Sequence, residues 1–126
     1  MQDIEETLGF VPGFFAGLSE ETLDAEWPQF KKYTLGETVI PEKYREMIGL
    51  AIAANIKCSY CTHFHLNTAR LHGATDEELE ELFYLAGHTA RWSSMIQAQD
   101  YDEGTFRDEF ARIAEHLQEG SESAAD

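Results

Sequence analysis

Basic residues are scarce in this chain of 126 residues, which has nine lysines and arginines against 24 aspartates and glutamates. The formal net charge is −15 at pH 7. Nucleic acids and anionic membrane surfaces attract basic patches, so we expect neither as a partner. The acidic residues are spread over most of the chain rather than concentrated in one segment. We interpret this even acidity as halophile-like, an adaptation to a salty cytoplasm, in preference to a site for an electropositive partner.

Long apolar runs are also missing, and none approaches the roughly 20 residues that a helix needs to cross a bilayer. Residues 1–6 are acidic and are not followed by the apolar stretch of a secretory signal. We therefore expect a cytoplasmic protein without a membrane span. The hydrophobic content of 43% and the aromatic content of 12% are sufficient for a packed core. We predict one domain over 1–118 and a disordered acidic tail over 119–126.

Sustained strand-like alternation is absent, whereas helical periodicity is present along most of the chain. We predict helices over about 2–8, from 12 or 13 onward, and over 19–33, 41–54, 59–71, 75–98 and 104–117. Pro41 suits a first helical turn, and Gly73 suits a left-handed C-cap. Thr75 and Glu78 have the spacing of a capping box, whereas Pro28 lies inside a predicted helix that it can kink or divide. The fold class is therefore all-α.

Only two cysteines occur, and both lie in the segment Cys58-Ser-Tyr-Cys61-Thr-His-Phe-His65. On a helix, positions three and seven residues after the first lie within about 60° of it around the axis, so Cys58, Cys61 and His65 share one face. The backbone N–H groups at a helix N-terminus favour the thiolate form of a cysteine. In a cytoplasmic protein, a lone C-x-x-C pair is more often catalytic or redox-sensing than a permanent structural disulfide. The segment predicts thiol redox chemistry.

Two other interpretations of this segment remain open. The cysteines could be apolar residues of a buried stripe, although that would not explain a histidine one turn after a C-x-x-C pair. A zinc site is the stronger alternative to thiol redox chemistry, because the segment has four candidate metal donors: Cys58, Cys61, His63 and His65. However, His63 points about 140° away from Cys58 on the same helix, and the chain has no second C-x-x-C or H-x-x-x-H pair. We therefore expect no metal and no cofactor.

Glu46 lies twelve residues before Cys58, on the apolar helix that precedes the motif. We expect the chain to reverse near 55–57 if the two helices pack together. Glu46 then lies about 12 Å from the reversal along its helix, and Cys61 and His65 lie about 5 to 10 Å from it along the next helix. Antiparallel packing then brings them side by side, and a buried carboxylate needs such a partner. An equally good interpretation places Glu46 in solvent near the helix start, where an acidic residue suits the helix dipole.

Four residues together reproduce the pattern E-x(11)-C-x-x-C-x(3)-H, namely Glu46, Cys58, Cys61 and His65. With this pattern the chain resembles the AhpD-like alkylhydroperoxidases of the carboxymuconolactone decarboxylase superfamily. The resemblance extends upstream to residues 8–15, which are similar to that family's Gly-x-x-Pro segment, and downstream to 86–92, so it covers nearly the whole chain. It implies an AhpD-like helical bundle with the C-x-x-C motif at the N-terminus of a central helix.

The resemblance also implies an activity, the thiol-dependent reduction of organic hydroperoxides. In that cycle Cys61 attacks the peroxide and becomes a sulfenic acid, and Cys58 resolves it into a disulfide. His65 and Glu46 relay the proton. The implied partners are a hydroperoxide substrate, an external thiol or disulfide reductant, and further copies of the chain in a homo-oligomer, commonly a trimer or hexamer.

One residue of the motif departs from the pattern of some family members, which have a histidine directly before the second cysteine. This chain has Tyr60 there. A phenol hydrogen-bonds but does not take up a proton near neutral pH. Tyr60 therefore favours a second hypothesis, in which the chain is a non-peroxidatic thiol–disulfide exchange protein or a redox sensor.

Overall fold

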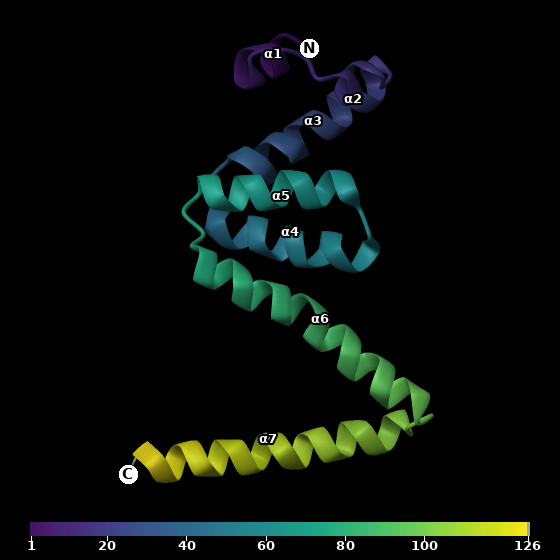
Figure 1. Cartoon of the computed structure of the whole chain (residues 1–126), viewed down its shortest axis with the longest axis vertical. Helices are drawn as coiled ribbons and strands as arrows, with labels where there is room; N and C mark the ends of the chain where they lie inside the picture. The colour runs from purple at the N-terminus through teal and green to yellow at the C-terminus, as the bar shows by residue number, and fades with distance from the viewer. Residues whose placement is uncertain (126) are drawn as a thin grey trace. The chain divides into compact units, whose positions relative to one another are not determined.

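The computed structural model describes residues 1–125 and the side chains of residues 1–121. The described residues form seven helices and no strand, which confirms the all-α class. The helices are α1 (Gln2–Leu8), α2 (Gly13–Ala16), α3 (Glu20–Leu35), α4 (Glu42–Ile56), α5 (Ser59–Leu71), α6 (Asp76–Ala98) and α7 (Glu103–Ala125) (Figure 1). The chain divides into two compact units, of which the first is Met1–Leu82 and the second begins at Phe83, inside α6.

An aromatic core joins helices α1, α2 and α3 in the first unit. Its buried side chains are Ile4, Phe15, Leu23 and Trp27. The Phe15 ring meets the Trp27 ring edge-on, with the centroids 5.5 Å apart, a favoured geometry for aromatic pairs. The indole N–H of Trp27 donates a hydrogen bond of 2.8 Å to Asp3 on α1. Helix α3 continues through Pro28 as one helix, so this proline does not divide it.

Helices α4 and α5 lie side by side and run in opposite directions (Figure 1). A second core of four buried side chains joins them to the start of α6, and its members are Leu50, Ala69, Leu79 and Leu82. The chain reverses at Lys57, which has a left-handed φ of 60° and caps α4. The break predicted at 55–57 therefore lies at Lys57, and residues 55 and 56 still belong to α4. The reversal places α5 directly after α4, which buries Glu46, Leu50 and Ala53 but leaves Ile48, Ile52 and Ile56 exposed in this single chain.

The connection from α5 to α6 uses the predicted capping signals. Gly73 has a φ of 92°, a left-handed conformation that glycine adopts without a steric penalty. The N–H of Glu78 donates to the Thr75 hydroxyl at 3.1 Å, and the N–H of Thr75 donates to the Glu78 carboxylate at 3.0 Å. Lys43 on α4 also pairs with this carboxylate at 3.0 Å. The Thr75 backbone hydrogen bond, with Lys43 beside it, lowers the pKa of Glu78 below its ordinary value.

The second unit contains the rest of α6 and helix α7. Asp102 caps α7, because its carboxylate accepts a hydrogen bond of 2.8 Å from the N–H of Thr105, and this bond lowers the pKa of Asp102. The Tyr101 hydroxyl donates to Glu109 on α7. Large apolar side chains recur along α7 and are exposed in this single chain, namely Phe106, Phe110, Ile113 and Leu117. A homo-oligomer that covers them stays a prediction.

Helix α7 ends at Ala125, beyond the end near Leu117 that the sequence predicts. The residues after Leu117 include glutamine, glutamate and alanine, which are good helix formers. Residue 126 lies outside the described residues. The disordered tail over 119–126 and the single domain over 1–118 stay predictions.

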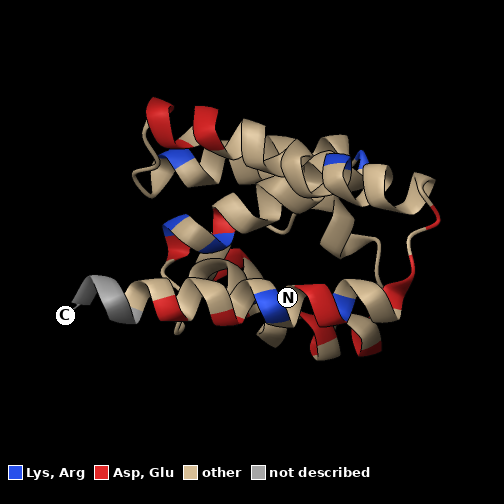
Figure 2. Ribbon diagram, turned by 90° about the horizontal axis from the view of Figure 1, so that it is seen from below, with Lys and Arg blue, Asp and Glu red and all other residues tan. Residues whose placement is uncertain are grey.

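Acidic side chains outnumber basic ones on the helices of both units, as the red and blue ribbon segments of Figure 2 show. Within the described part of the chain, no helix is both long enough and apolar enough to cross a membrane.

Candidate active site

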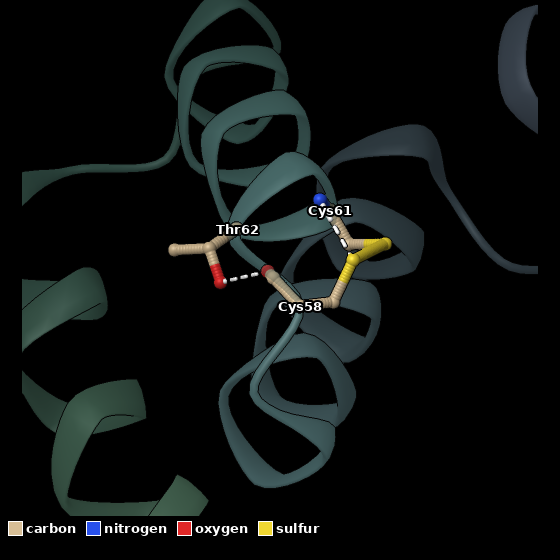
Figure 3. Close-up of a disulfide and its surroundings, with 3 residues drawn as sticks. All are labelled: Cys58, Cys61 and Thr62. Atoms are coloured by element: carbon tan, nitrogen blue, oxygen red, sulfur yellow. Dashed lines mark hydrogen bonds between the residues drawn. A yellow bond between two sulfur atoms is a disulfide. The ribbon is translucent and has the colours of Figure 1, made fainter. Parts of the chain in front are cut away.

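The two cysteines form the N-terminal turn of helix α5. Cys58 is the N-cap residue, with an extended backbone, and its Sγ accepts a hydrogen bond of 3.2 Å from the N–H of Cys61 (Figure 3). The Thr62 hydroxyl donates a hydrogen bond of 2.9 Å to the carbonyl oxygen of Cys58 (Figure 3). Cys58 therefore occupies the position of a serine or aspartate cap, where the helix dipole and a backbone N–H stabilise negative charge on sulfur.

Cys58 and Cys61 are joined by a disulfide, and their Cα atoms are 5.3 Å apart (Figure 3). Both residues are half-buried. Their separation of three residues closes a ring within one helical turn. In this disulfide-bonded form, both cysteines lie at the start of α5.

A buried carboxylate and a histidine form the second pair of the site. Oε2 of Glu46 on α4 lies 2.6 Å from Nδ1 of His65 on α5. The Glu46 side chain is only 3% exposed, whereas that of His65 is 27% exposed. Glu46 is the buried charged residue of the described chain. Because an isolated buried carboxylate is costly, the imidazole is the partner that makes this burial tolerable.

The four predicted site residues therefore form two pairs on adjacent helices. From the sequence, Glu46 could be either buried beside the motif helix or exposed to solvent. The structure places it in the interior, against His65. His65 follows Cys61 by four residues on α5, so their side chains are neighbours on one helix surface. His63 and Tyr60 are both exposed, with the Tyr60 side chain 87% accessible.

Gly49 is a site neighbour that the sequence analysis does not single out. It lies on α4, one turn after Glu46, and the His65 ring is packed directly against it. A glycine inside an otherwise apolar helix costs helix stability and is a signal of close approach. That signal is present in the segment Met47-Ile-Gly-Leu-Ala51.

Comparisons with known proteins identify the family and the fold of the chain. The family model of the carboxymuconolactone decarboxylase family matches residues 21–101. Among solved structures, the chain is similar to the alkylhydroperoxidase AhpD core from Rhodospirillum rubrum, with 32% sequence identity and a TM-score of 0.68. The match covers 83% of this chain and 82% of that one. None of the curated proteins compared with the chain matches it.

Fold and site together define an all-α protein that has a C-x-x-C disulfide at the start of one helix and, further along that helix, a partly exposed histidine paired with a buried glutamate. The chain belongs to the carboxymuconolactone decarboxylase family and is an AhpD-like member of that superfamily. The family resemblance read from the sequence is confirmed.

Proposed function

We propose that this protein is a thiol-dependent peroxidase that reduces organic hydroperoxides. One observation carries the proposal: a C-x-x-C pair that closes a disulfide at the start of α5 is followed one turn later by a histidine bonded to a buried glutamate. Similarity to the Rhodospirillum rubrum alkylhydroperoxidase AhpD core supports it. Redox turnover requires both an oxidisable pair and a proton carrier, and this helix pair contains both.

The first step is attack by the reduced Cys61 thiolate on the terminal oxygen of the hydroperoxide, ROOH. The O–O bond breaks, the alkoxide takes up a proton and leaves as the alcohol ROH, and Cys61 becomes a sulfenic acid. The thiol of Cys58 then attacks the sulfenic sulfur, the Cys58–Cys61 bond forms, and water leaves. In total, ROOH and two thiols give ROH, water and one disulfide, a two-electron change.

His65 is the proton carrier of this scheme. The Glu46 side chain accepts the hydrogen bond from Nδ1–H of His65, and this leaves Nε2 as the nitrogen that exchanges protons. Nε2 takes the proton of the Cys61 thiol and returns it to the departing alkoxide. The burial of Glu46 gives the imidazole a fixed orientation, because both residues are on helices packed against each other.

An external thiol or dithiol must reopen the disulfide after each turnover. The two cysteines are half-buried in the first turn of α5, and the intervening Tyr60 is exposed. A reductant can therefore approach the disulfide from the side of this turn. Its first thiolate attacks one sulfur, which frees one cysteine and leaves the other in a mixed disulfide with the reductant. A second reductant thiol then attacks the reductant's sulfur, so that the second cysteine is regenerated and the reductant leaves as a disulfide.

The deciding experiment treats the fully reduced protein with a small excess of cumene hydroperoxide and follows intact mass and free thiols with time. We expect both thiols to disappear with a mass decrease of about two units, as a disulfide forms. In the Cys58→Ser variant a sulfenic acid should accumulate on Cys61, whereas Cys61→Ser should not react. Persistence of both wild-type thiols for hours would overturn the proposal.

A second candidate function is thiol–disulfide exchange with another protein or redox sensing, and Tyr60 is the observation that favours it. Tyr60 replaces the histidine of some family members and is 87% exposed, where a partner protein can contact it. In this case Cys58→Ser should trap a mixed disulfide with the partner instead of a sulfenic acid. Fast oxidation of the reduced wild type by a disulfide-bearing protein, but not by cumene hydroperoxide, would favour exchange.

A further inference from the structure

Gly49 leaves no room for a side chain on the face of α4 that meets His65. A Cβ atom built on Gly49 would lie 2.5 Å from Cε1 of His65, and 2.7 Å from each ring nitrogen. Separations below about 3 Å are not tolerated between non-bonded heavy atoms, since optimal carbon contacts are about 3.5 to 4.0 Å. The imidazole therefore occupies the space that any other residue at position 49 would fill.

The His65 ring is also restrained on its other sides. Its Nδ1 is 2.6 Å from the Glu46 carboxylate, and the Phe64 ring is oriented edge-on to it with the centroids 5.4 Å apart. Glu46 and Gly49 are three residues apart on α4, so they belong to the same helix face. One turn of α4 thus supplies both the hydrogen-bond acceptor of the ring and the space for the ring.

The backbone conformation at position 49 does not require a glycine. Gly49 lies within α4, and the glycines of the described chain with positive φ are Gly9 and Gly73. An alanine would therefore fit the backbone here and would favour the helix. The close approach of His65 is the remaining feature of this position that excludes a Cβ.

We propose that Gly49 is a positioning residue for His65, which sets the orientation of the imidazole toward the Glu46 carboxylate and the cysteine pair. A methyl group at this position must rotate the ring away or push α5 from α4, and either change lengthens the bond between Nδ1 and Oε2. The consequence for turnover rests on the proposed peroxidase function. The contact between Gly49 and the His65 ring does not depend on that function. The contact and its effect on turnover are therefore tested separately.

The contact is tested by a double-mutant cycle on thermal unfolding of the full chain, with Gly49→Ala, His65→Ala and both together. In the wild-type background Gly49→Ala should lower Tm. In the His65→Ala background the ring is gone, and the same change should raise Tm by about 2 to 5 °C, the usual effect of alanine for glycine inside a helix. This reversal of sign isolates the pairwise contact.

Gly87→Ala is the matched control. Gly87 lies inside helix α6, and a Cβ there meets nothing within 4 Å. It should raise Tm equally in both backgrounds. If Gly49→Ala alone does not fold, the double variant must still fold and exceed His65→Ala in Tm. Should His65→Ala itself not fold, His65→Asn replaces it, since asparagine lacks the Cε1 and Nε2 positions. A Gly49→Ala effect of the same sign in both backgrounds would overturn the proposal.

The consequence for chemistry is tested by the rate of disulfide formation with cumene hydroperoxide between pH 5 and 9. Gly49→Ala should slow oxidation about 10- to 100-fold and change the shape of the pH profile, whereas Gly87→Ala should leave both unchanged. When Gly49→Ala is added to His65→Ala, the rate of oxidation should fall no further. An unchanged rate and pH profile in folded Gly49→Ala would refute the positioning role. If the wild type does not react, the proposed function fails, while the unfolding cycle still decides whether the contact exists.

Discussion

Glu46 and His65 are nineteen residues apart in sequence, yet Oε2 of the first lies 2.6 Å from Nδ1 of the second. Their environments differ, since the Glu46 side chain is 3% exposed and that of His65 is 27% exposed. Water can therefore replace a lost partner for the histidine but not for the glutamate. Because of this difference in exposure, substitutions of Glu46 and of His65 should change the stability of the fold by different amounts.

Replacing Glu46 by methionine should preserve stability while slowing turnover. Methionine fills a similar volume, and the partly exposed His65 can hydrogen-bond to water instead, so the free energy of unfolding should stay constant or rise by about 1 kcal/mol. His65→Ala instead leaves a buried carboxylate without a partner and should cost about 3 kcal/mol. Urea unfolding of both variants measures the difference.

In the same variants, oxidation by cumene hydroperoxide should fall about 100-fold or more, because each change removes general acid–base catalysis. Glu81→Met, at an exposed position of α6, is the control for a change of charge and should leave the rate unchanged. A Glu46→Met variant that is strongly destabilised, or that reacts at the wild-type rate, would contradict the relay.

Reduction of the disulfide should weaken the fold only slightly. The bond links residues three apart and closes a very short loop, for which the loss of chain entropy predicts a stabilisation of about 2 kcal/mol. Reduced protein should therefore remain folded, with a urea midpoint somewhat below that of the oxidised form. The Cys58→Ser/Cys61→Ser double variant should show no response to dithiothreitol. Complete unfolding on reduction would mean that the bond is structural, which is incompatible with a redox cycle.

Stability should depend on pH through Glu78. Its pKa is lowered in the folded chain by the Thr75 N–H and by Lys43, so the ionised carboxylate stabilises the fold. This contribution is fully present above the unfolded pKa and is lost as the pH falls through the lower, folded pKa. The stability advantage of wild type over Glu78→Gln should thus be constant above about pH 5 and shrink below it. An advantage that grows on acidification would contradict this assignment.

The core that supports the site should be sensitive to truncation. Leu50 is 3% exposed and packs with Ala69, Leu79 and Leu82. Leu50→Ala should cost about 3 kcal/mol in unfolding free energy, from the lost transfer energy and the cavity that remains. Leu71→Ala is the control on α5, where the side chain is 80% exposed, and it should cost less than about 0.5 kcal/mol. Equal losses would show that Leu71 is covered in solution by another copy of the chain.

Most of the helices were predictable because their signals are local. The Thr75–Glu78 capping box, the left-handed Gly73 and the break at Lys57 each depend on residues within a few positions of one another. Local signals were weaker at the C-terminus, where α7 continues to Ala125. Glutamate and alanine there favour a helix as well as an acidic tail, so the end of the helix could not be predicted.

The sequence by itself determined the all-α class, the family, and the single turn that holds both cysteines. All three depend on residue type and short spacing, which are visible in the printed chain. Only the tertiary structure decided that Glu46 is buried and that Gly49 lies against the His65 ring. Both facts depend on the rotation of α4 about its own axis relative to α5. Helix rotation of this kind follows from side-chain packing between helices. Here Leu50 of α4 shares a buried cluster with Ala69 of α5 and Leu79 of α6, and no local pattern specifies such long-range packing.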